Sequence, residues 1–168
     1  MGKGLVPDWY FAKYDDVTPA FLIEQGIRYL ILDIDNTIAP YEQAVPDERN
    51  LAWLAALKAS GIRCAFVSNN RYERVELFNR HIGLPMFAPA AKPLRKFMRQ
   101  AMLMLGAKPE ATAIMGDQLF TDCLAGRAVG IRTIAVPPIK DKTDLFTRAK
   151  RVLEIPFMRA YKKREEKR

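Results

Sequence analysis

The sequence of 168 residues has few of the side chains that build zinc and redox centres. It contains one histidine, His81, and two cysteines, Cys64 and Cys123, and neither cysteine has the spacing of a metal ligand. These absences argue against a zinc site and against a disulfide-stabilised scaffold. We expect both thiols to be reduced and mostly buried.

Long apolar runs are also absent, and none approaches the length that a helix needs to cross a bilayer. The apolar stretch at residues 4–7 is too short for a signal peptide. Gly2 lacks the Ser or Thr that a myristoylation site has a few residues later. We therefore expect a cytoplasmic protein with no transmembrane segment.

Positive charge is what the sequence has in excess, with a formal net charge of +8. This balance favours an anionic partner, which could be a phosphorylated substrate, an anionic lipid surface or a nucleic acid. A basic surface that serves only solubility is the alternative. Composition alone does not decide between these readings.

Apolar runs alternate with amphipathic stretches along the chain, which predicts an α/β fold. We predict strands at residues 29–33, 62–67, 86–88, 111–115 and 131–136, and helices at residues 47–60, 71–81, 93–105, 121–129 and 143–153. This order gives a doubly wound, Rossmann-like parallel sheet of five strands with helices on both faces. Ligands of such sheets bind at the carboxyl ends of the strands.

The first predicted strand ends in two carboxylates, Asp33 and Asp35, with Thr37 close behind. Carboxylates that leave an apolar strand are costly unless they are used or neutralised. One could attack phosphorus and the other could transfer protons to and from the reacting oxygens. A turn motif, which also favours Asp, Asn and Thr, is the alternative.

Phosphate-binding candidates follow the next two strands. Ser68 and Asn69 stand at the start of a predicted helix, where backbone N–H groups cradle anions, although a simple helix cap explains them equally well. Lys92 could offset transition-state charge or be a solvated surface lysine. Arg71 and Arg74 could hold an anionic substrate or lie at solvated positions of the helix.

The fourth strand ends in Asp117, and Asp122 follows it. Oxygen ligands in this arrangement suit Mg²⁺, whereas acidic residues that favour a helix N-terminus are the alternative. All these signals fall at the same edge of the predicted sheet. Together they would supply a nucleophile, an acid/base, a phosphate grip and a metal site.

This pattern resembles the haloacid dehalogenase (HAD)-type phosphatases over roughly residues 29–136, and implies their fold. The resemblance implies that Asp33 is the nucleophile and that Asp35 is the general acid/base. It makes Mg²⁺ the cofactor, with Asp33, Asp35 and Asp117 as ligands, Asp35 through its backbone carbonyl. The remaining expected roles are phosphate binding by Ser68, Asn69, Lys92 and Thr37, and indirect support of Lys92 or the metal by Asp122.

The short segments between the motifs leave no room for a cap domain, so we expect an open site. Such a site suits a phosphate presented on something large, although a second subunit could cover it for a small metabolite. The chain most resembles the capless type IIIA members, and among them the phosphatidylglycerophosphate phosphatases, in three local features: Leu5–Tyr10 followed by Asp15–Val17, Gly26–Ile27 before the first strand, and Ala91–Pro93. Polynucleotide-end phosphatase and non-catalytic basic scaffold are the alternatives.

Three regions are expected along the chain. Residues 1–26 form an aromatic and basic extension on or beside the core, residues 27–155 form the HAD-like phosphatase domain, and residues 156–168 form a basic tail. Trp9, Tyr10 and Phe11 could settle at a lipid interface or pack on the core. This interpretation favours the inner face of an anionic membrane over nucleic acid as the partner, which the protein would contact peripherally. The oligomeric state stays open.

Overall fold

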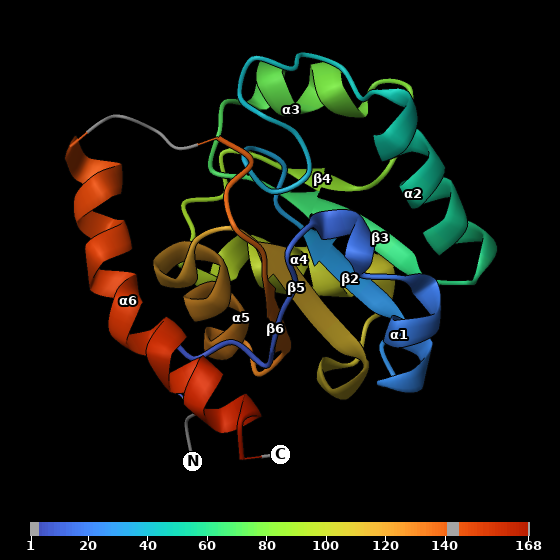
Figure 1. The fold of residues 1–168 in the computed structure, drawn as a ribbon. Helices are drawn as coiled ribbons and strands as arrows, with labels where there is room; N and C mark the ends of the chain where they lie inside the picture. Colours follow the sequence, from blue (N-terminus) through green and yellow to red (C-terminus); the bar gives the residue numbers. More distant parts are fainter. Residues whose placement is uncertain (1–3, 141–144, 168) are drawn as a thin grey trace.

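Residues 4–140 and 145–167 are described by the computed structural model, and six of their segments form one parallel sheet (Figure 1). The strand order is β1-β6-β5-β2-β3-β4. The strands are β1 (Trp9–Tyr10), β2 (Tyr29–Leu32), β3 (Arg63–Val67), β4 (Met86–Phe87), β5 (Thr112–Gly116) and β6 (Arg132–Ala135). The predicted doubly wound, parallel α/β fold is confirmed, but the prediction of five strands was wrong.

The additional strand, β1, comes from the aromatic N-terminal segment. Trp9 pairs with Ile134 of β6, and the backbone amide of Phe11 donates to the carbonyl of Ala135. The rings of Trp9 and Phe11 also pack edge-on against Phe21. This segment was not predicted as part of the sheet, because two residues are too few to show an alternating pattern; β4 is as short but was predicted from the apolar run at residues 86–88.

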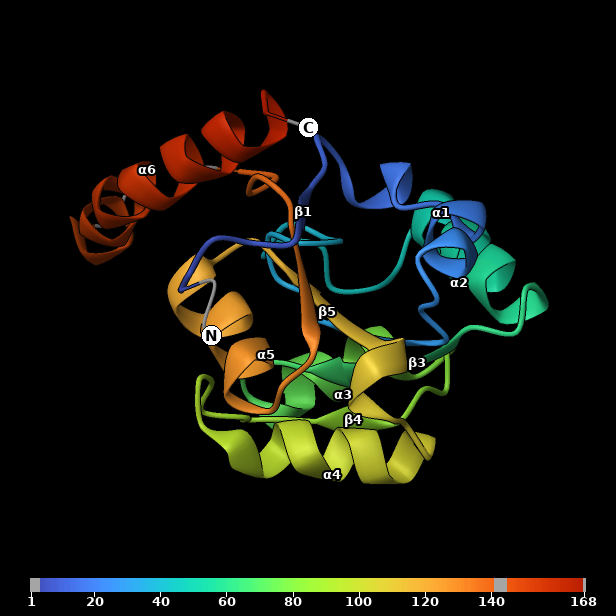
Figure 2. The ribbon, with the colours of Figure 1, turned by 90° about the horizontal axis from the view of Figure 1, so that it is seen from below.

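Helices cover both faces of the sheet (Figure 2). They are α1 (Pro19–Glu24), α2 (Glu48–Ala59), α3 (Tyr72–Asn79), α4 (Arg95–Leu105), α5 (Leu124–Ala128) and α6 (Leu145–Glu165). Because side chains alternate along a strand, Leu30 and Leu32 of β2 pack with α1, α2 and α3, whereas Ile31 packs with α4 and α5.

The segment predicted as a helix at residues 121–129 forms two elements. A π-helical turn spans Leu119–Cys123, and α5 follows it. The wider turn places the side chain of Asp122 against Gly116, where a Cβ atom would overlap the carboxylate. Wide turns of this kind occur frequently at functional sites, and this one explains why a glycine precedes Asp117.

The helix predicted to end at residue 153 continues to Glu165, so α6 includes most of the segment predicted as a basic tail. The predicted helix start at Thr143 lies outside the described residues. The guanidinium of Arg164 donates to the carbonyls of Pro7 and Asp8, and the amide of Tyr10 donates to the Tyr161 hydroxyl. The helix is therefore attached to the N-terminal segment.

Among the described residues, none of the helices combines the length and the apolar composition that a transmembrane segment needs. Cys64 and Cys123 are both buried and free, as expected. Burial raises the pKa of the Cys64 thiol to about 12, so this group stays protonated and unreactive at neutral pH.

Candidate active site

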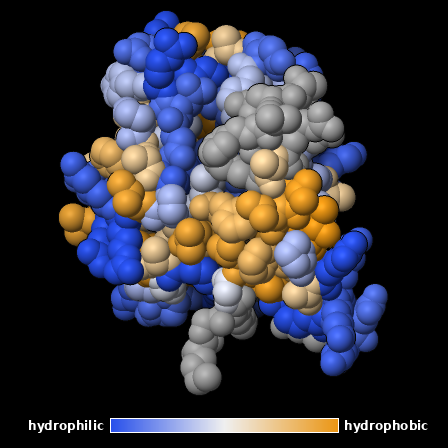
Figure 3. All heavy atoms as spheres, turned by 90° about the vertical axis from the view of Figure 1, so that its left-hand side faces the viewer, coloured by the Kyte–Doolittle hydropathy of each residue, from blue (hydrophilic) through white to orange (hydrophobic). Residues whose placement is uncertain are grey.

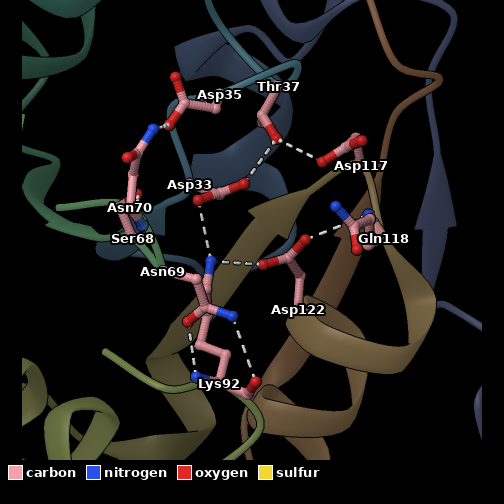
Figure 4. A network of polar contacts seen from close by, with 10 residues as sticks. All are labelled: Asp33, Asp35, Thr37, Ser68, Asn69, Asn70, Lys92, Asp117, Gln118 and Asp122. Carbon is pink, nitrogen blue, oxygen red and sulfur yellow. Dashed lines mark hydrogen bonds and ion pairs between the residues drawn. The ribbon is translucent and has the colours of Figure 1, made fainter. Parts of the chain in front are cut away.

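The predicted site residues lie at the carboxyl edge of the sheet, where the strand order reverses beside β2 (Figure 4). Asp33 follows β2 and Asp117 follows β5, the neighbouring strand. Ser68 follows β3, and Lys92 reaches the same place from the loop after β4. Residues far apart in the sequence therefore meet because parallel strands all end at one edge.

Three buried carboxylates form the centre of the site. Asp33, Asp117 and Asp122 are 8%, 4% and 1% exposed, and one oxygen atom of each lies within 4.8 Å of the others. The hydroxyl of Thr37 lies 3.3 Å from Asp33 Oδ2 and 3.3 Å from Asp117 Oδ1. Since a hydroxyl has one proton, Thr37 can donate to only one of the two at a time.

Lys92 supplies the positive charge of this cluster. Its Nζ atom lies 2.9 Å from Asp33 Oδ1 and 2.6 Å from Asp122 Oδ1, and its side chain is 2% exposed. Burial alone would lower the pKa of Lys92, but the charges of Asp122 and Asp33 outweigh it and raise the pKa. Lys92 therefore stays protonated at every pH at which the enzyme would work.

Asn69 fixes the position of this lysine. The Asn69 side chain accepts the Lys92 amide hydrogen over 2.6 Å and donates to the Lys92 carbonyl over 3.2 Å. The side-chain amide of Asn69 is thus occupied by the backbone of Lys92, whereas the backbone amide of Asn69 takes no part in this pairing. Ser68, 1% exposed, accepts a hydrogen bond from the Asn70 amide.

Asp122 is the second carboxylate that contacts Lys92. Besides the Lys92 ion pair, its second oxygen accepts the amide hydrogen of Gln118 over 3.1 Å. Both oxygens are therefore engaged inside the protein. This arrangement holds the lysine ammonium between two carboxylates.

The site holds three carboxylates but only one lysine among the described residues, and this excess of negative charge contributes to a raised pKa of Asp33. Burial raises the pKa of Asp33 to about 7 against the opposing charge of Lys92, and Asp122 and Asp35 add to the rise. A divalent cation at this cluster would neutralise the excess. The buried carboxylates of Asp33 and Asp117 fit such an ion, because hard cations prefer carboxylate ligands, and Asp122 lies close to them with both oxygens engaged.

Asp35 lies apart from this cluster and points toward α3 (Figure 4). Its Oδ1 accepts from Arg74 Nη2 over 3.1 Å, and its Oδ2 accepts from Asn70 Nδ2 over 2.7 Å. The sequence predicted Arg74 either as an anion ligand or as a solvated helix residue, and it did not single out Asn70. The sequence offered one signal for Arg74, which is a basic residue in the first turn of a helix that begins shortly after Ser68.

The sequence is similar to those of known phosphatases. A family model described as HAD-hydrolase-like matches residues 89–153. The probable phosphatase YqeG of Bacillus subtilis is 33% identical over 164 residues, which cover 98% of this chain and 95% of that protein. The glyceraldehyde 3-phosphate phosphatase of Pyrococcus furiosus is 26% identical over 62% of this chain and 46% of its own length.

Solved structures share the fold. An uncharacterised protein from Listeria monocytogenes superposes with a TM-score of 0.55 at 16% identity, over 70% of this chain and 85% of its own. The cobalt-bound deoxy-D-mannose-octulosonate 8-phosphate phosphatase of Haemophilus influenzae gives 0.50 at 17% identity, over 67% and 69%. The chain belongs to the HAD-like phosphatases, and it is an enzyme that hydrolyses phosphoric monoesters.

Proposed function

We propose that this phosphatase uses Mg²⁺ and an aspartyl-phosphate on Asp33 to dephosphorylate phosphatidylglycerophosphate at an anionic membrane surface. The proposal places the chain among the capless type IIIA members of its family. The observation that carries it is the open site. Between Asp35 and Ser68 the chain forms only loops, α2 and β3, and between Ser68 and Lys92 only α3, β4 and their loops. Neither segment adds a cap, so a phosphate on a large surface can reach Asp33.

The chemistry follows from the placement of the side chains. A carboxylate oxygen of Asp33 forms a bond to phosphorus while the bond to the leaving oxygen breaks, and Asp35 gives that oxygen its proton. Asp35 then takes a proton from the water that attacks the aspartyl-phosphate, which releases phosphate and regenerates Asp33. Lys92 and Ser68 hold the transferring phosphoryl group, with Thr37 and the Asn69 amide beside them.

Mg²⁺ suits this site because Asp33 and Asp117 carry buried oxygens on either side of the Thr37 hydroxyl. The backbone carbonyl of Asp35 is the further ligand that we propose. Bound there, the ion would offset the charge of the carboxylates and of the phosphoryl oxygens. Asp122, with both oxygens engaged, supports Lys92 instead.

Metal binding should stabilise the protein measurably. At about 100 times the dissociation constant, Mg²⁺ adds about 2.7 kcal/mol to the free energy of unfolding. At ~2–4 °C per kcal/mol for a domain of this size, the melting temperature should rise by roughly 5–10 °C. Differential scanning fluorimetry with MgCl₂, with chelator and with NaCl of equal ionic strength measures this rise. An Asp117→Asn variant that keeps the full rise would refute the site.

A surface on α6 supports the choice of an anionic bilayer as the partner. Val152, Leu153 and Ile155 are 64%, 60% and 45% exposed, and the exposed residues Arg159, Lys162 and Lys163 continue the same side of the helix. Glu154, the acidic residue within this stretch, is buried. Figure 3 shows apolar residues gathered on this side of the molecule beside hydrophilic ones. Exposed apolar side chains and nearby Lys and Arg side chains both favour contact with an anionic bilayer.

Through its buried side, α6 is also connected to the active site. The Glu154 carboxylate accepts the amide hydrogen of Leu119 over 2.8 Å, in the loop that carries Asp117 and Asp122. A second copy of the chain is a poorer partner for the α6 face, because it would bring an equally basic surface against it. A bilayer with anionic headgroups pairs with both halves of the face at once.

The test separates substrate from surface. Phosphate release is measured from phosphatidylglycerophosphate in phosphatidylglycerol vesicles, from 5′- and 3′-phosphorylated oligonucleotides and from p-nitrophenyl phosphate. We expect the Val152→Gln, Leu153→Gln, Ile155→Gln triple variant to lose at least about tenfold on vesicles, since burying an apolar side chain of this size contributes about 1.5–3 kcal/mol. Its rate on p-nitrophenyl phosphate should stay within about twofold, since the variant leaves the chemical step intact.

The matched control is Leu103→Gln with Met104→Gln, which removes two exposed apolar residues from α4. This control should act on vesicles like the parent protein. Release concentrated on oligonucleotides would transfer the assignment to polynucleotide ends. An equal loss in the control and the triple variant would remove α6 from the proposal.

A further inference from the structure

The carboxylate of Asp35 is held by two side chains that have no place in the scheme above. Arg74 donates to one oxygen over 3.1 Å and Asn70 donates to the other over 2.7 Å. Asp35 is 5% exposed, so these contacts lie inside the protein. Each oxygen keeps a further lone pair, which leaves Asp35 able to take up and deliver a proton.

Arg74 is itself fixed on several sides. Its Nη1 atom donates to the carbonyl of Ala44 over 3.3 Å, and its guanidinium lies 5.4 Å from the centre of the Phe78 ring. Its side chain is 15% exposed, and its buried Nε has no hydrogen-bond partner among the described residues. A buried donor without a hydrogen-bond partner costs free energy. The guanidinium is therefore placed to contact Asp35 even though this leaves one of its own donors unsatisfied.

Asn70 connects this contact to the phosphate site. Its backbone amide donates to the Ser68 hydroxyl over 3.1 Å, while its side chain donates to Asp35. One residue thus joins the group that would hold the phosphoryl oxygens to the group that would protonate the leaving oxygen. The distance between these two groups decides whether the proton is delivered in line with bond cleavage.

We propose that Arg74 and Asn70 are positioning residues that direct the Asp35 carboxyl toward the leaving group and away from Asp33, Asp117 and Asp122. The proposal rests on the acid/base role given above to Asp35. Without the two contacts, Asp35 is free to turn toward the carboxylate cluster and its cation. The chemical step is unchanged: the leaving oxygen receives the Asp35 proton as its bond to phosphorus breaks.

Leaving groups of different basicity reveal a misplaced acid. An alkoxide needs a proton as it departs, whereas p-nitrophenolate leaves readily without one. General acid catalysis contributes ~10²–10⁴-fold, so Arg74→Met should lower kcat on an alkyl phosphate by about 10–100-fold. On p-nitrophenyl phosphate the same variant should lose less than about threefold, and KM should change little on either substrate. Arg74→Lys, which keeps the charge but loses the planar fork, should recover part of the alkyl rate.

Two further variants make the result decisive. Asn70→Ala removes one hydrogen bond and no charge, so it carries the test if Arg74→Met does not fold, and it should show the same selective loss. Arg80→Met is the matched control, because Arg80 closes the same helix and its side chain pairs with Glu76 at the surface. We expect it to behave like the parent protein on both substrates.

Equal losses on the alkyl and aryl substrates in Arg74→Met and Asn70→Ala would assign both residues a merely structural role and overturn the proposal. Asp35→Asn is the reference, and an equal loss there would overturn the acid/base role of Asp35 itself. Both assays use soluble substrates. Failure of the phosphatidylglycerophosphate assignment would therefore leave this result untouched, and the two failures are distinguishable.

Discussion

Asp33→Asn should abolish turnover on every substrate while the protein stays folded. The amide nitrogen and oxygen of asparagine cannot form the aspartyl-phosphate, and removing a covalent nucleophile costs on the order of 10⁴–10⁶-fold in kcat. Phosphate release under saturating MgCl₂ measures the loss. Acid quenching of the parent protein during turnover, followed by peptide mass analysis, should find one phosphoryl group on the peptide that contains Asp33 and none in the variant.

The matched control is Asp16→Asn, which makes the same substitution at an exposed aspartate. It should retain the parent rate. Residual activity of Asp33→Asn above about one-hundredth of the parent would contradict covalent catalysis at Asp33, because water attack with the remaining groups recovers only a small share of the rate. The Lys92–Asp122 ion pair, 2.6 Å long, does not involve Asp33 and should keep the variant folded.

The same variant should change how stability depends on pH. The pKa of Asp33 is raised by burial to about 7 from an ordinary value of 3.8. Between these values the folded state binds more protons than the unfolded state, so the free energy of unfolding falls as pH rises through this window. In chelator, Asp33→Asn should lack this part of the fall and be at least as stable as the parent at pH 8. Chemical denaturation at pH 5 and pH 8 measures both proteins.

The positions of Asp33, Ser68, Lys92 and Asp117 were predictable because one physical rule places them. Apolar runs mark buried parallel strands, and such strands end at a common edge, so the polar residues after them must converge. No distance between them is needed for that conclusion. The resemblance to HAD phosphatases used the same four segments and was confirmed at the level of the family.

The contacts of Asp35 could not be predicted in this way. Arg74 reaches Asp35 because α3 turns its third residue toward the loop after β2. The hydrophobic periodicity of a helix or a strand does not show how the two elements are placed relative to each other. The attachment of α6 is similar, since Arg164 meets the backbone of Pro7 and Asp8 across almost the whole sequence. A charge-rich segment has the same composition whether it is solvated or docked, so composition alone left this open.

Lys92→Met should separate the stability of the site from its catalysis. The ammonium lies between Asp33 and Asp122, 2.9 and 2.6 Å from their oxygens, and removing it leaves two buried carboxylates without their cation. Breaking a buried ion pair from one side costs ~3–5 kcal/mol. At ~2–4 °C per kcal/mol the melting temperature should fall by roughly 10 °C in chelator. Loss of one charge-stabilising donor should also lower kcat by about 10²–10³-fold.

The double variant Lys92→Met, Asp122→Asn tells these two effects apart. Replacing Asp122 removes one uncompensated charge, so the double variant should regain much of the lost stability, and the two substitutions should be strongly non-additive. Its kcat should stay as low as that of Lys92→Met, because no group replaces the ammonium at the phosphoryl oxygens. Lys58→Met, at an exposed lysine of α2, is the control for removing a charge.

The double-variant comparison should be made at pH 8, above the Asp33 pKa of about 7, so that Asp33 is charged in the parent protein. The charges of Asp122 and Asp33 raise the pKa of Lys92, so the ammonium is present in the parent throughout pH 5–8 and its contribution to stability is lost only at far higher pH. A double variant as unstable as Lys92→Met would show that Asp122 is not the partner whose charge Lys92 neutralises. Recovered stability with kcat still low would mean that Lys92 holds the carboxylates together in the resting enzyme and the phosphoryl oxygens during the reaction.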